Sequence, residues 1–310
     1  MCALLVSMGG EPLQWNSRHE CHSSELCYEG FDYASFFDAQ DRRLLDRLER
    51  LVVSELLPRQ GRRIVDLGGG FGRMTGTYAG RFEEAYLVDS AWSLLQQARQ
   101  RWQDRLIVVA ADIRHPPFRD GAFDAALAVR VLHHFSDPRS VIIRSARLLS
   151  QGGTLVFNYS NKRNLHRMLG VASGNREAHP FRRGIERYGP RSFGLHPKDV
   201  TVMLEEADLR VKQRRGVGIV DKMAPLLGRA AEILPPGKTL SRVPGVAKLA
   251  PSVFEAAVAA TGRSCPEERT PFVCPACRGS VAGAADGKRY RCPACAAEFP
   301  LRDGIWDFRV

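Results

Sequence analysis

The sequence predicts an α/β protein whose core is a doubly wound, mostly parallel sheet, followed by a helical lid and a small C-terminal module. Three observations support this expectation. A short apolar run at residues 64–67 ends in a glycine-rich turn. Apolar runs and helical patterns then alternate as far as residue 160, as expected for strands joined by helical crossovers. Near the C-terminus, two Cys-Pro-Ala-Cys motifs enclose a short polar segment.

The N-terminal segment is expected to cover this core. Residues 28–56 combine aromatic side chains with an amphipathic helical pattern that would pack ahead of the first strand. Core packing is the favoured role of Tyr28, Tyr33 and Phe36, and closure of a ligand pocket is the alternative. The apolar positions of the helical pattern are Leu44, Leu45, Leu48, Leu51 and Val52.

A group of possible metal ligands precedes this helix. It consists of His19, Cys21, His22 and Cys27. Their spacing fits no metal-ribbon pattern, so a disordered or covering segment is favoured over a metal site.

The glycine-rich turn has Gly68, Gly70 and Gly72 at alternate positions after Asp66. Glycines permit positive φ angles and let backbone N–H groups approach a ligand where a strand turns sharply into a helix. A dinucleotide-binding loop would carry its third glycine one position later, where this chain has Arg73. The loop therefore fits S-adenosylmethionine better than NAD, although turns of this kind also serve packing alone.

The next two strands each end near a carboxylate. Residues 84–89 read as the second strand, and Asp89 follows Gly70 by 19 positions, where it could accept hydrogen bonds from both ribose hydroxyls. Residues 106–110 read as the third strand. Asp112 and Ile113 follow it, a carboxylate for an adenine amine beside an apolar side chain for the ring face, with an ordinary cap or turn as the alternative for Asp112.

The fourth and fifth strands are expected at residues 123–129 and 152–159. The fourth leads into Arg130, His133 and His134 as the chain turns into a helix, and ligands of open α/β sheets bind at this edge. Either histidine could act as a general base, and a structural role at the start of a helix is the alternative. Arg130 is an equally open candidate for a substrate contact.

The segment after the fifth strand is expected to form the lid and the remaining sheet elements. Residues 196–208 read as a helix leading into a sixth strand at 209–217. Residues 221–262 look helical with breaks at prolines, and residues 270–274 would return as the last strand of the sheet.

This lid is strongly basic. Residues 161–250 contain 18 Lys and Arg against 8 Asp and Glu, a surplus of 10 in a chain of net charge +11. A solvated basic surface or attraction to anionic lipid is the simple interpretation. The alternative is binding of an anionic substrate or a phosphate backbone. The arginines and the lysine concerned are Arg182, Arg183, Arg187, Arg191, Lys212, Arg214 and Arg215.

The two C-terminal motifs predict a metal site. Cys274 with Cys277, and Cys292 with Cys295, form two pairs of the same spacing, which suits four thiolates around one tetrahedral structural zinc. The segment between them has too few large apolar residues to fold alone, and metal binding can supply on the order of 10 kcal/mol. Two disulfides are the alternative, but nothing in the sequence indicates an oxidising compartment.

Composition fits a soluble cytoplasmic protein. The hydrophobic fraction of 44% is sufficient for a packed core, and no apolar run approaches the ~20 residues needed to span a membrane. The first residues lack the basic region of a signal peptide. No obligate protein partner is evident.

The region from 60 to 160 resembles the class I S-adenosylmethionine-dependent methyltransferases, with a Rossmann-like fold and a domain of the methyltransferase type 11 kind. The resemblance rests on the sequences at 65–72, 87–90, 117–124, 131–135 and 149–153. It implies that Asp66, Gly68 and Gly70 line the methionine end of the cofactor. It also implies that Asp89 holds the ribose, and that Asp112 with Ile113 holds the adenine.

The C-terminal 40 or so residues resemble the small zinc-ribbon proteins that activate RNA and protein methyltransferases. The resemblance rests on the cysteine pairs and on the ending at 298–308, which includes an Arg-Asp-Gly-Ile run. It implies that such a module is fused to its enzyme within one chain.

We therefore expect four parts: a covering segment and cap helix (1–58), a cofactor-binding core (59–160), a lid with the remaining sheet elements (161–264), and a zinc ribbon (265–310). The favoured function is methyl transfer to a small or lipid-like acceptor by in-line displacement. An RNA methyltransferase acting on tRNA or rRNA, and a catalytically silent binding protein, are the alternatives. The candidate cofactor-binding residues are Asp66, Gly68, Gly70, Gly72, Asp89, Asp112, Ile113 and Arg130.

Overall fold

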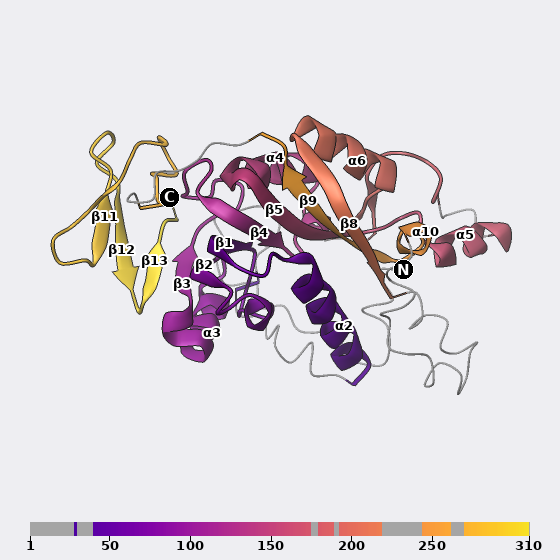
Figure 1. Ribbon diagram of the computed structural model, residues 1–310, viewed down its shortest axis with the longest axis horizontal. Helices are drawn as coiled ribbons and strands as arrows, with labels where there is room; N and C mark the ends of the chain where they lie inside the picture. Colours follow the sequence, from indigo (N-terminus) through magenta and orange to yellow (C-terminus); the bar gives the residue numbers. More distant parts are fainter. Residues whose placement is uncertain are drawn as a thin grey trace.

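The computed structural model describes residues 28–29, 40–174, 179–188, 192–218, 244–261 and 270–309. The histidines and cysteines at 19–27 lie outside these ranges, as do Tyr33, Phe36 and Arg191. The described residues form one mixed sheet of 11 strands with helices on both faces, and a separate two-stranded hairpin (Figure 1).

Seven strands make up the central sheet, in the order β3-β2-β1-β4-β5-β9-β8. The first five pair in parallel, whereas β9 runs antiparallel to both of its neighbours. The strand order reverses between β1 and β4, which is where open α/β sheets bind ligands. The predicted doubly wound sheet is confirmed. Its strands are β1 (Gly61–Leu67), β2 (Phe82–Asp89), β3 (Ile107–Ala110), β4 (Phe123–Ala128), β5 (Leu149–Ser160), β8 (Leu209–Val217) and β9 (Ser252–Ala259).

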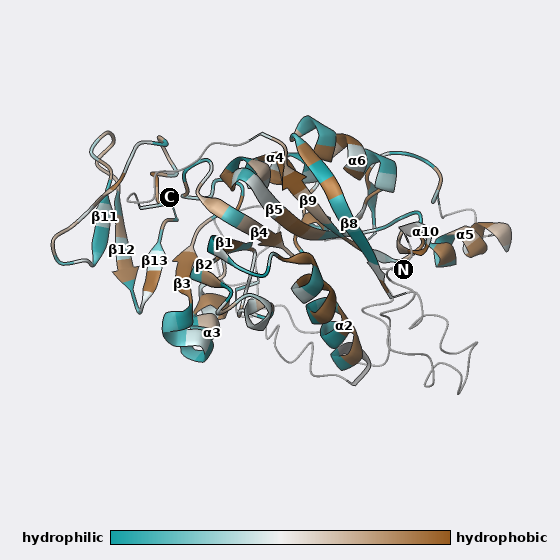
Figure 2. Ribbon diagram, viewed as in Figure 1, coloured by the Kyte–Doolittle hydropathy of each residue, from teal (hydrophilic) through white to brown (hydrophobic). Residues whose placement is uncertain are grey.

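Alternate residues of these strands pack into two apolar cores, one on each face of the sheet, because successive side chains of a strand point to opposite faces. Val65 and Leu67 belong to one core, which α4 (Pro138–Leu148) and α6 (Pro197–Glu206) cover. Ile64 belongs to the other, which α2 (Gln40–Leu56) and α3 (Trp92–Trp102) cover. Strands β3, β5 and β9 are accordingly mostly hydrophobic, whereas the edge strand β8 is largely hydrophilic (Figure 2).

The predicted cap helix is confirmed as α2, but its buried side is shifted from the expected one. Val52 and Val53 are buried, whereas Leu44 is 49% exposed and Leu51 is 37% exposed. The structure also contains α5 (Leu165–Ala172), α10 (Pro244–Ala247), and the hairpin of β6 (Glu186–Arg187) and β7 (Phe193–Gly194). Within the described ranges, the helices are too short or too polar to cross a membrane.

No α-helix follows the glycine-rich turn directly, contrary to expectation. The chain instead makes turns and a 3₁₀ helix, η2 (Thr75–Thr77). Glycine and threonine are weak helix formers, and η2 itself has the sequence Thr-Gly-Thr, with Gly80 shortly after it. Tyr78 turns inward here and is fully buried.

The expectation for the last strand of the sheet is also wrong. Residues 270–274 form only isolated bridges, at Phe272 and Val273, and the strand between β5 and β8 is β9. β9 lies in the stretch expected to be helical, where the sequence is rich in alanine. Long pairing with β5 and β8 overrides this local preference, and Glu255 within β9 is buried against Arg214 of β8.

The C-terminal module extends the same sheet. Its strands are β10 (Ala282–Gly283), β11 (Arg289–Arg291), β12 (Glu298–Arg302) and β13 (Ile305–Asp307). Each of these strands pairs antiparallel with the next one along the chain, and β13 also pairs in parallel with β3. The module therefore lies at one end of the molecule as a continuation of the central sheet (Figure 1).

Candidate functional site

An open cavity lies beyond the carboxyl ends of β1, β2, β3 and β4. It encloses about 1000 Å³ of empty space, including its open mouth. The residues that line it come from the ends of these four strands and from the segments that follow them, with Tyr28 added from the N-terminal segment. Those predicted from the sequence are Asp66, Gly68, Gly70, Asp89, Asp112, Ile113, Arg130 and His134.

The glycine-rich turn needs its glycines for different reasons. Gly68 has φ +69°, and an added Cβ would lie 2.7 Å from Val131 Cγ2. Gly72 has φ +77° and lies against Trp102, whose indole N–H donates to the Gly72 carbonyl at 3.1 Å. Gly72 is not among the residues lining the cavity. Its place in the structure is thus explained by packing, whereas Gly68 and Gly70 present backbone to the cavity.

Asp89 is held by backbone groups at the end of β2. One carboxylate oxygen accepts from the Gly70 N–H at 2.9 Å, and the other accepts from the Ala91 N–H at 3.0 Å. Burial raises the pKa of Asp89 from its ordinary value, although these backbone donors oppose the shift. The carboxylate is therefore fixed in orientation while it remains on the cavity wall.

Asp66 is the most buried of the acidic residues that line the cavity and is only 2% exposed. The Tyr78 hydroxyl donates to it at 3.0 Å, and the Thr75 hydroxyl lies 3.1 Å from the same tyrosine oxygen. Burial raises the pKa of Asp66 to about 7, although Tyr78 and Arg73 oppose this. Asp66 can therefore change its charge near neutral pH.

Asp112 and Ile113 lie on the cavity wall after β3. Arg114 binds the Asp112 carboxylate through its side chain at 2.7 to 3.1 Å and through its backbone N–H at 2.8 Å. Burial alone would raise the pKa of Asp112, but these Arg114 interactions lower it overall. Asp112 is therefore charged at neutral pH, and its orientation is set by Arg114.

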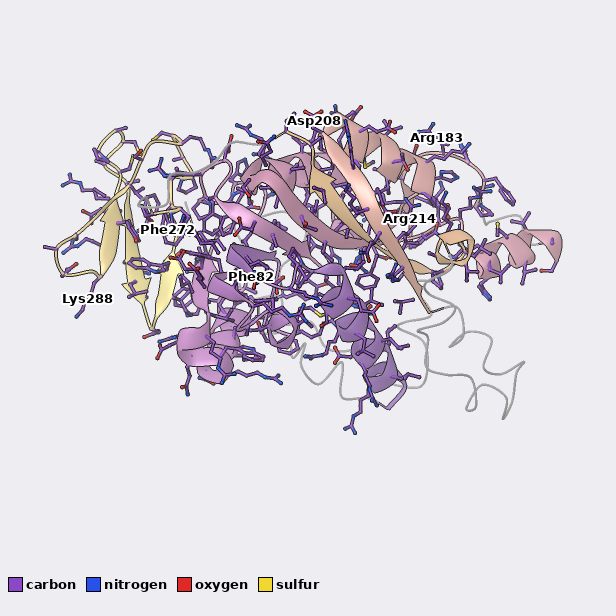
Figure 3. All side chains as sticks on the ribbon, in the orientation of Figure 1. Phe82, Arg183, Asp208, Arg214, Phe272 and Lys288 are labelled. Atoms are coloured by element: carbon purple, nitrogen blue, oxygen red, sulfur yellow. The ribbon has the colours of Figure 1, made fainter. Side chains whose placement is uncertain are left out.

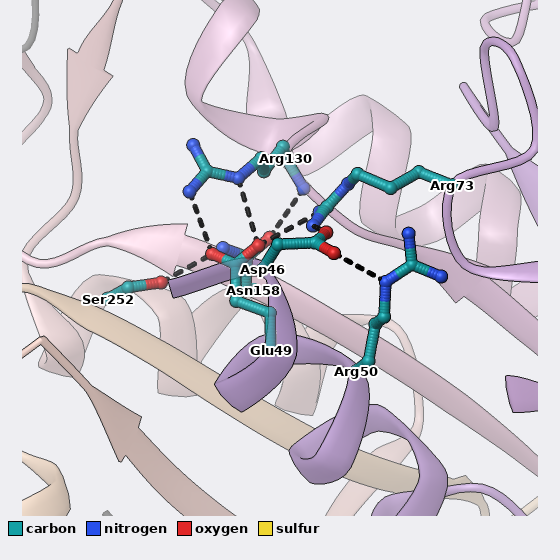
Figure 4. A network of polar contacts seen from close by, with 7 residues as sticks. All are labelled: Asp46, Glu49, Arg50, Arg73, Arg130, Asn158 and Ser252. Carbon is teal, nitrogen blue, oxygen red and sulfur yellow. Dashed lines mark hydrogen bonds and ion pairs between the residues drawn. The ribbon is translucent and has the colours of Figure 1, made fainter. Parts of the chain in front are cut away.

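Arg130 is engaged in a network that the sequence did not reveal (Figure 4). Its guanidinium donates to both oxygens of Glu49 in α2, at 3.1 and 2.9 Å. Arg73 also reaches Glu49, at 2.9 Å, and Asp46, at 2.7 Å. Burial raises the pKa of Glu49, but the two guanidinium groups outweigh this and lower it. The network fixes α2 to the loops after β1 and β4.

The backbone also commits Arg130 to this position. It has φ +61°, which is uncommon for a residue with a side chain, and its N–H donates to the Asn158 side chain at 2.6 Å. The acids of α2 at positions 46 and 49 face two arginines of the loops (Figure 4). The presence of two acids one turn apart on the cap helix was the available sequence signal, but nothing local identified their partners.

The two histidines lie in the 3₁₀ helix η4 (Leu132–His134), and only His134 lines the cavity. His134 Nε2 lies 2.9 Å from the Tyr28 hydroxyl, and the two rings meet edge to face. His133 lies behind it, with ring centroids 3.9 Å apart, and its buried Nδ1 has no hydrogen-bond partner among the described residues. Burial, with contributions from His134 and Arg130, lowers the pKa of His133 well below its usual range. His133 is therefore neutral, and His134 is the histidine that a ligand can reach.

The four cysteines of the C-terminal module converge as predicted. Their sulfur atoms all lie within 4.8 Å of one another, with Cys274 and Cys295 Sγ atoms 3.6 Å apart and Cys277 and Cys292 Sγ atoms 3.4 Å apart. All four are free thiols, so the disulfide alternative does not describe this arrangement. A tetrahedral ion with bonds of ~2.3 Å separates its sulfur ligands by about 3.8 Å, so the cluster fits zinc.

The two cysteine pairs also share their backbone geometry. Arg278 N–H donates to the Cys274 carbonyl, and Ala296 N–H donates to the Cys292 carbonyl, both at 2.9 Å. Arg278 and Ala296 both have positive φ, at 61° and 60°. This repetition explains how two Cys-Pro-Ala-Cys turns present four sulfurs to one point.

The basic lid is partly neutralised in the structure. Arg183 pairs with Asp199, Arg214 with buried Glu255, and Arg215 with Glu55. Arg182, Arg187 and Lys212 are exposed. The described part of the lid therefore contains both ion-paired arginines and exposed cations.

Comparisons with known proteins connect this cavity to a family. Residues 65–157 match the family described as a methyltransferase domain. The chain is 34% identical over 119 residues to a malonyl-[acyl-carrier protein] O-methyltransferase of Legionella pneumophila, which covers 37% of this chain and 40% of that protein. It is 28% identical over 171 residues to a ubiquinone biosynthesis O-methyltransferase of Xanthomonas oryzae pv. oryzae, which covers 53% of this chain and 70% of that protein.

The fold is also that of solved methyltransferases. Magnesium protoporphyrin IX methyltransferase from Synechocystis PCC 6803, solved with bound S-adenosylhomocysteine, has 15% identity and a TM-score of 0.50. The likeness covers 72% of this chain and 87% of that chain. At this identity it concerns the fold alone. The chain spans less than half the length of the Legionella relative, so the match to that relative is limited to part of each protein.

Proposed function

We propose that the chain transfers the methyl group of S-adenosylmethionine to a small or lipid-like acceptor, in keeping with the match of residues 65–157 to a methyltransferase domain. The observation that carries this proposal is the placement of Gly68, Gly70, Asp89 and Asp112 around one cavity at successive strand ends. Ribose hydroxyls would bond the fixed carboxylate of Asp89. The adenine would lie between Asp112 and Ile113, and the methionine end would extend past Gly68 toward Asp66.

Methyl transfer requires little covalent chemistry from the protein. A lone pair of the acceptor attacks the methyl carbon, the carbon–sulfur bond breaks, and its electrons remain on sulfur as a neutral thioether. The positive sulfonium already activates the methyl group, so the site mainly aligns the reactants and excludes water. If the acceptor is a hydroxyl, it also loses a proton, and His134 is the base we assign to it because it reaches the cavity.

A small or lipid-like acceptor is favoured over RNA. The named relatives are O-methyltransferases, one of malonyl-[acyl-carrier protein] and one of ubiquinone biosynthesis. Tyr28 lies across part of the cavity, and several lid arginines are already paired with carboxylates. Salt would separate the two alternatives, because binding through several phosphates weakens by orders of magnitude between low and moderate salt. Binding of a buried small acceptor would change little over the same range of salt concentration.

We also propose that Cys274, Cys277, Cys292 and Cys295 hold a structural zinc ion. The four cysteines would fill all four coordination positions of the ion, which leaves no open position for a substrate. The role of the ion would be to hold together a module with a small apolar core.

The cofactor assignment is tested by calorimetric titration with S-adenosylmethionine and S-adenosylhomocysteine, with NAD as the control ligand. We expect micromolar binding of the first two alone. Asp89→Asn should weaken binding at least about tenfold, because a neutral amide loses the charge-assisted bonds to the ribose. Asp104→Asn is the matched control, since the Asp104 side chain is 95% exposed. Equal affinity of wild type and Asp89→Asn would remove Asp89 from the site.

The buried carboxyl of Asp66 predicts a pH dependence of binding. A bound cofactor brings a sulfonium and an ammonium group, which favour the ionised form of Asp66 and lower its pKa. Since the pKa of Asp66 in the free protein is about 7, binding should release a proton near and below that pH. Affinity should therefore rise as pH increases from 6 to about 8. Asp66→Asn should flatten this slope, and an unchanged slope in that variant would place the titrating group elsewhere.

A further inference from the structure

The last described residues of the C-terminal module lie close to the cofactor cavity. β13 pairs with β3 up to Asp307 and Ala110, and the Phe308 N–H then donates to the Ala110 carbonyl at 2.8 Å. The next residue after Ala110 already lines the cavity. Residues 305–308 therefore run beside β3, the strand that leads into Asp112 and Ile113.

Arg309 is oriented by its own neighbours toward α3. Its guanidinium donates to both oxygens of Asp307, each at 2.9 Å, and lies 4.8 Å from the centre of the Trp92 ring. Trp92 is the first residue of α3, which follows Asp89 closely in the chain. Cation–π contact with an indole is the strongest of its kind. Arg309 thus joins the C-terminal module to α3, the helix that begins shortly after Asp89, whose carboxylate is proposed to bind the ribose.

Glu29 meets the same helix end from the N-terminal segment. α3 has no side-chain cap of its own and no acid in its first turn. Glu29 accepts the Ser93 N–H at 3.1 Å and so supplies the missing acceptor to a helix N-terminus. Arg309 and Glu29 therefore contact adjacent residues, Trp92 and Ser93, in the first turn of α3.

Tyr28, next to Glu29, reaches across the cavity. Its ring packs on the apolar group of Phe71, Ala91 and Leu94, and its hydroxyl bonds His134 on the other side. The dipeptide of Tyr28 and Glu29 therefore contacts the loops after β1 and β2 as well as the loop after β4. Anything that loosens Glu29 should also loosen Tyr28 above the cofactor.

We infer that Arg309 is a positioning residue of the cofactor site: it packs on Trp92 at the start of α3, the helix end that Glu29 caps, and thereby keeps Tyr28 across the cavity. The C-terminal module then affects cofactor retention through an identified side chain, in addition to completing the sheet. This inference rests on the proposed function for its ligand. The arrangement of Arg309, Trp92, Glu29 and Tyr28 is itself independent of any ligand.

The first test measures dissociation of S-adenosylhomocysteine from the full-length protein. Arg309→Ala should increase the dissociation rate and the dissociation constant about three- to tenfold. Arg309→Lys should restore most of the affinity, because it keeps a cation over the Trp92 ring. Arg291→Ala, an exposed arginine of the same module, is the control and should match wild type. Glu29→Gln should have a similar effect to Arg309→Ala, and the double variant should be less affected than the two effects combined.

The second test is hydrogen exchange of the peptide containing residues 28 and 29, measured without ligand. Arg309→Ala should raise exchange in this peptide while the thermal midpoint and the exchange of β1 stay unchanged. Wild-type affinity together with wild-type exchange in Arg309→Ala would overturn the inference. If wild-type protein binds neither cofactor form, the proposed function fails, and the exchange measurement still decides the role of Arg309.

Discussion

The two edges of the central sheet differ in how they are protected. At one edge, β3 is short and apolar, and β13 pairs with it. At the other, β8 is the last strand of the sheet in the described part of the chain, and it carries exposed Arg210 and Lys212. An unpaired strand edge invites association with other chains, and charged side chains are one way to prevent this. The β8 edge protects itself by charge, whereas the β3 edge depends on the C-terminal module.

The apolar surface beside β3 shows why charge alone would not suffice there. Phe118, Phe123 and Tyr86 form an edge-to-face cluster, with ring centroids 4.9 to 5.6 Å apart. Phe272 stacks on Phe118 at 5.4 Å and on Phe308 at 4.8 Å, which joins this cluster to the module. Phe272 lies at the junction, while Lys288 lies at the far side of the module (Figure 3). The module is therefore part of the core at this edge.

The largest expected effect comes from removing the proposed metal. Cys292→Ser should release the bound zinc and unfold the module, because metal binding supplies most of its folding free energy. The β3 edge would then be uncovered, so we expect the thermal midpoint to fall by more than about 8 °C and the protein to associate. Mass spectrometry measures the zinc content of each variant, and calorimetry measures its thermal midpoint.

Ala294→Ser is the control for this variant, because it places a hydroxyl at an exposed position between Cys292 and Cys295 and leaves all four thiols intact. It should retain one zinc per chain and the wild-type midpoint. A wild-type protein that is free of metal and equally stable would contradict the zinc assignment. Zinc loss with an unchanged midpoint would instead show that the β3 edge does not depend on the module.

The next effect is smaller and tests the aromatic junction. Phe272 is 3% exposed, so Phe272→Ala should lower the free energy of unfolding by about 3 to 4 kcal/mol through lost burial and a cavity. Phe181→Ala, at a site 59% exposed, should change it by less than about 0.5 kcal/mol. Denaturant unfolding measures both. Equal stability of the two variants would mean that the junction contributes little to the sheet.

The parts of this molecule that the sequence predicted are those set by short-range requirements. The turn at Gly68 and Gly70 needs positive φ within a few residues of a strand. Asp89 follows at the end of the next strand, and each cysteine pair is one local turn. These features are visible in spacing alone, because each depends on a few neighbouring residues.

The parts that were missed depend on partners far along the chain. β9 lies in the stretch that was expected to be helical, yet it is fixed as a strand by pairing with β5 and β8. Glu49 meets Arg130 across 81 positions, and β13 joins β3 across nearly 200 positions, where no local pattern indicates the partner. The side-chain contacts that position the candidate site were thus less predictable than the backbone that forms it.

The smallest effect expected at the β3 edge comes from Arg278. Its guanidinium donates to the carbonyls of Pro116 and Phe118, at 3.1 and 2.9 Å, and pairs with Asp120 at 3.1 Å. Arg278→Ala leaves two carbonyls without this donor, so we expect a loss of about 1 to 2 kcal/mol in denaturant unfolding. Arg278→Lys should recover less than half of this, because an ammonium lacks the planar fork that spans two acceptors.

Arg289→Ala is the control, since its partners Asp286 and Glu298 lie within the module. Arg289→Ala should lower the free energy of unfolding by less than about 0.5 kcal/mol, as expected when an exposed ion pair is removed. If Arg278→Ala costs no more than Arg289→Ala, strand pairing and the aromatic cluster alone join the module to the sheet. If Arg278→Ala costs more and Arg278→Lys fails to recover the loss, hydrogen bonds from the first cysteine turn to the chain after β3 also contribute, and the metal-binding half of the module is itself part of the β3 edge.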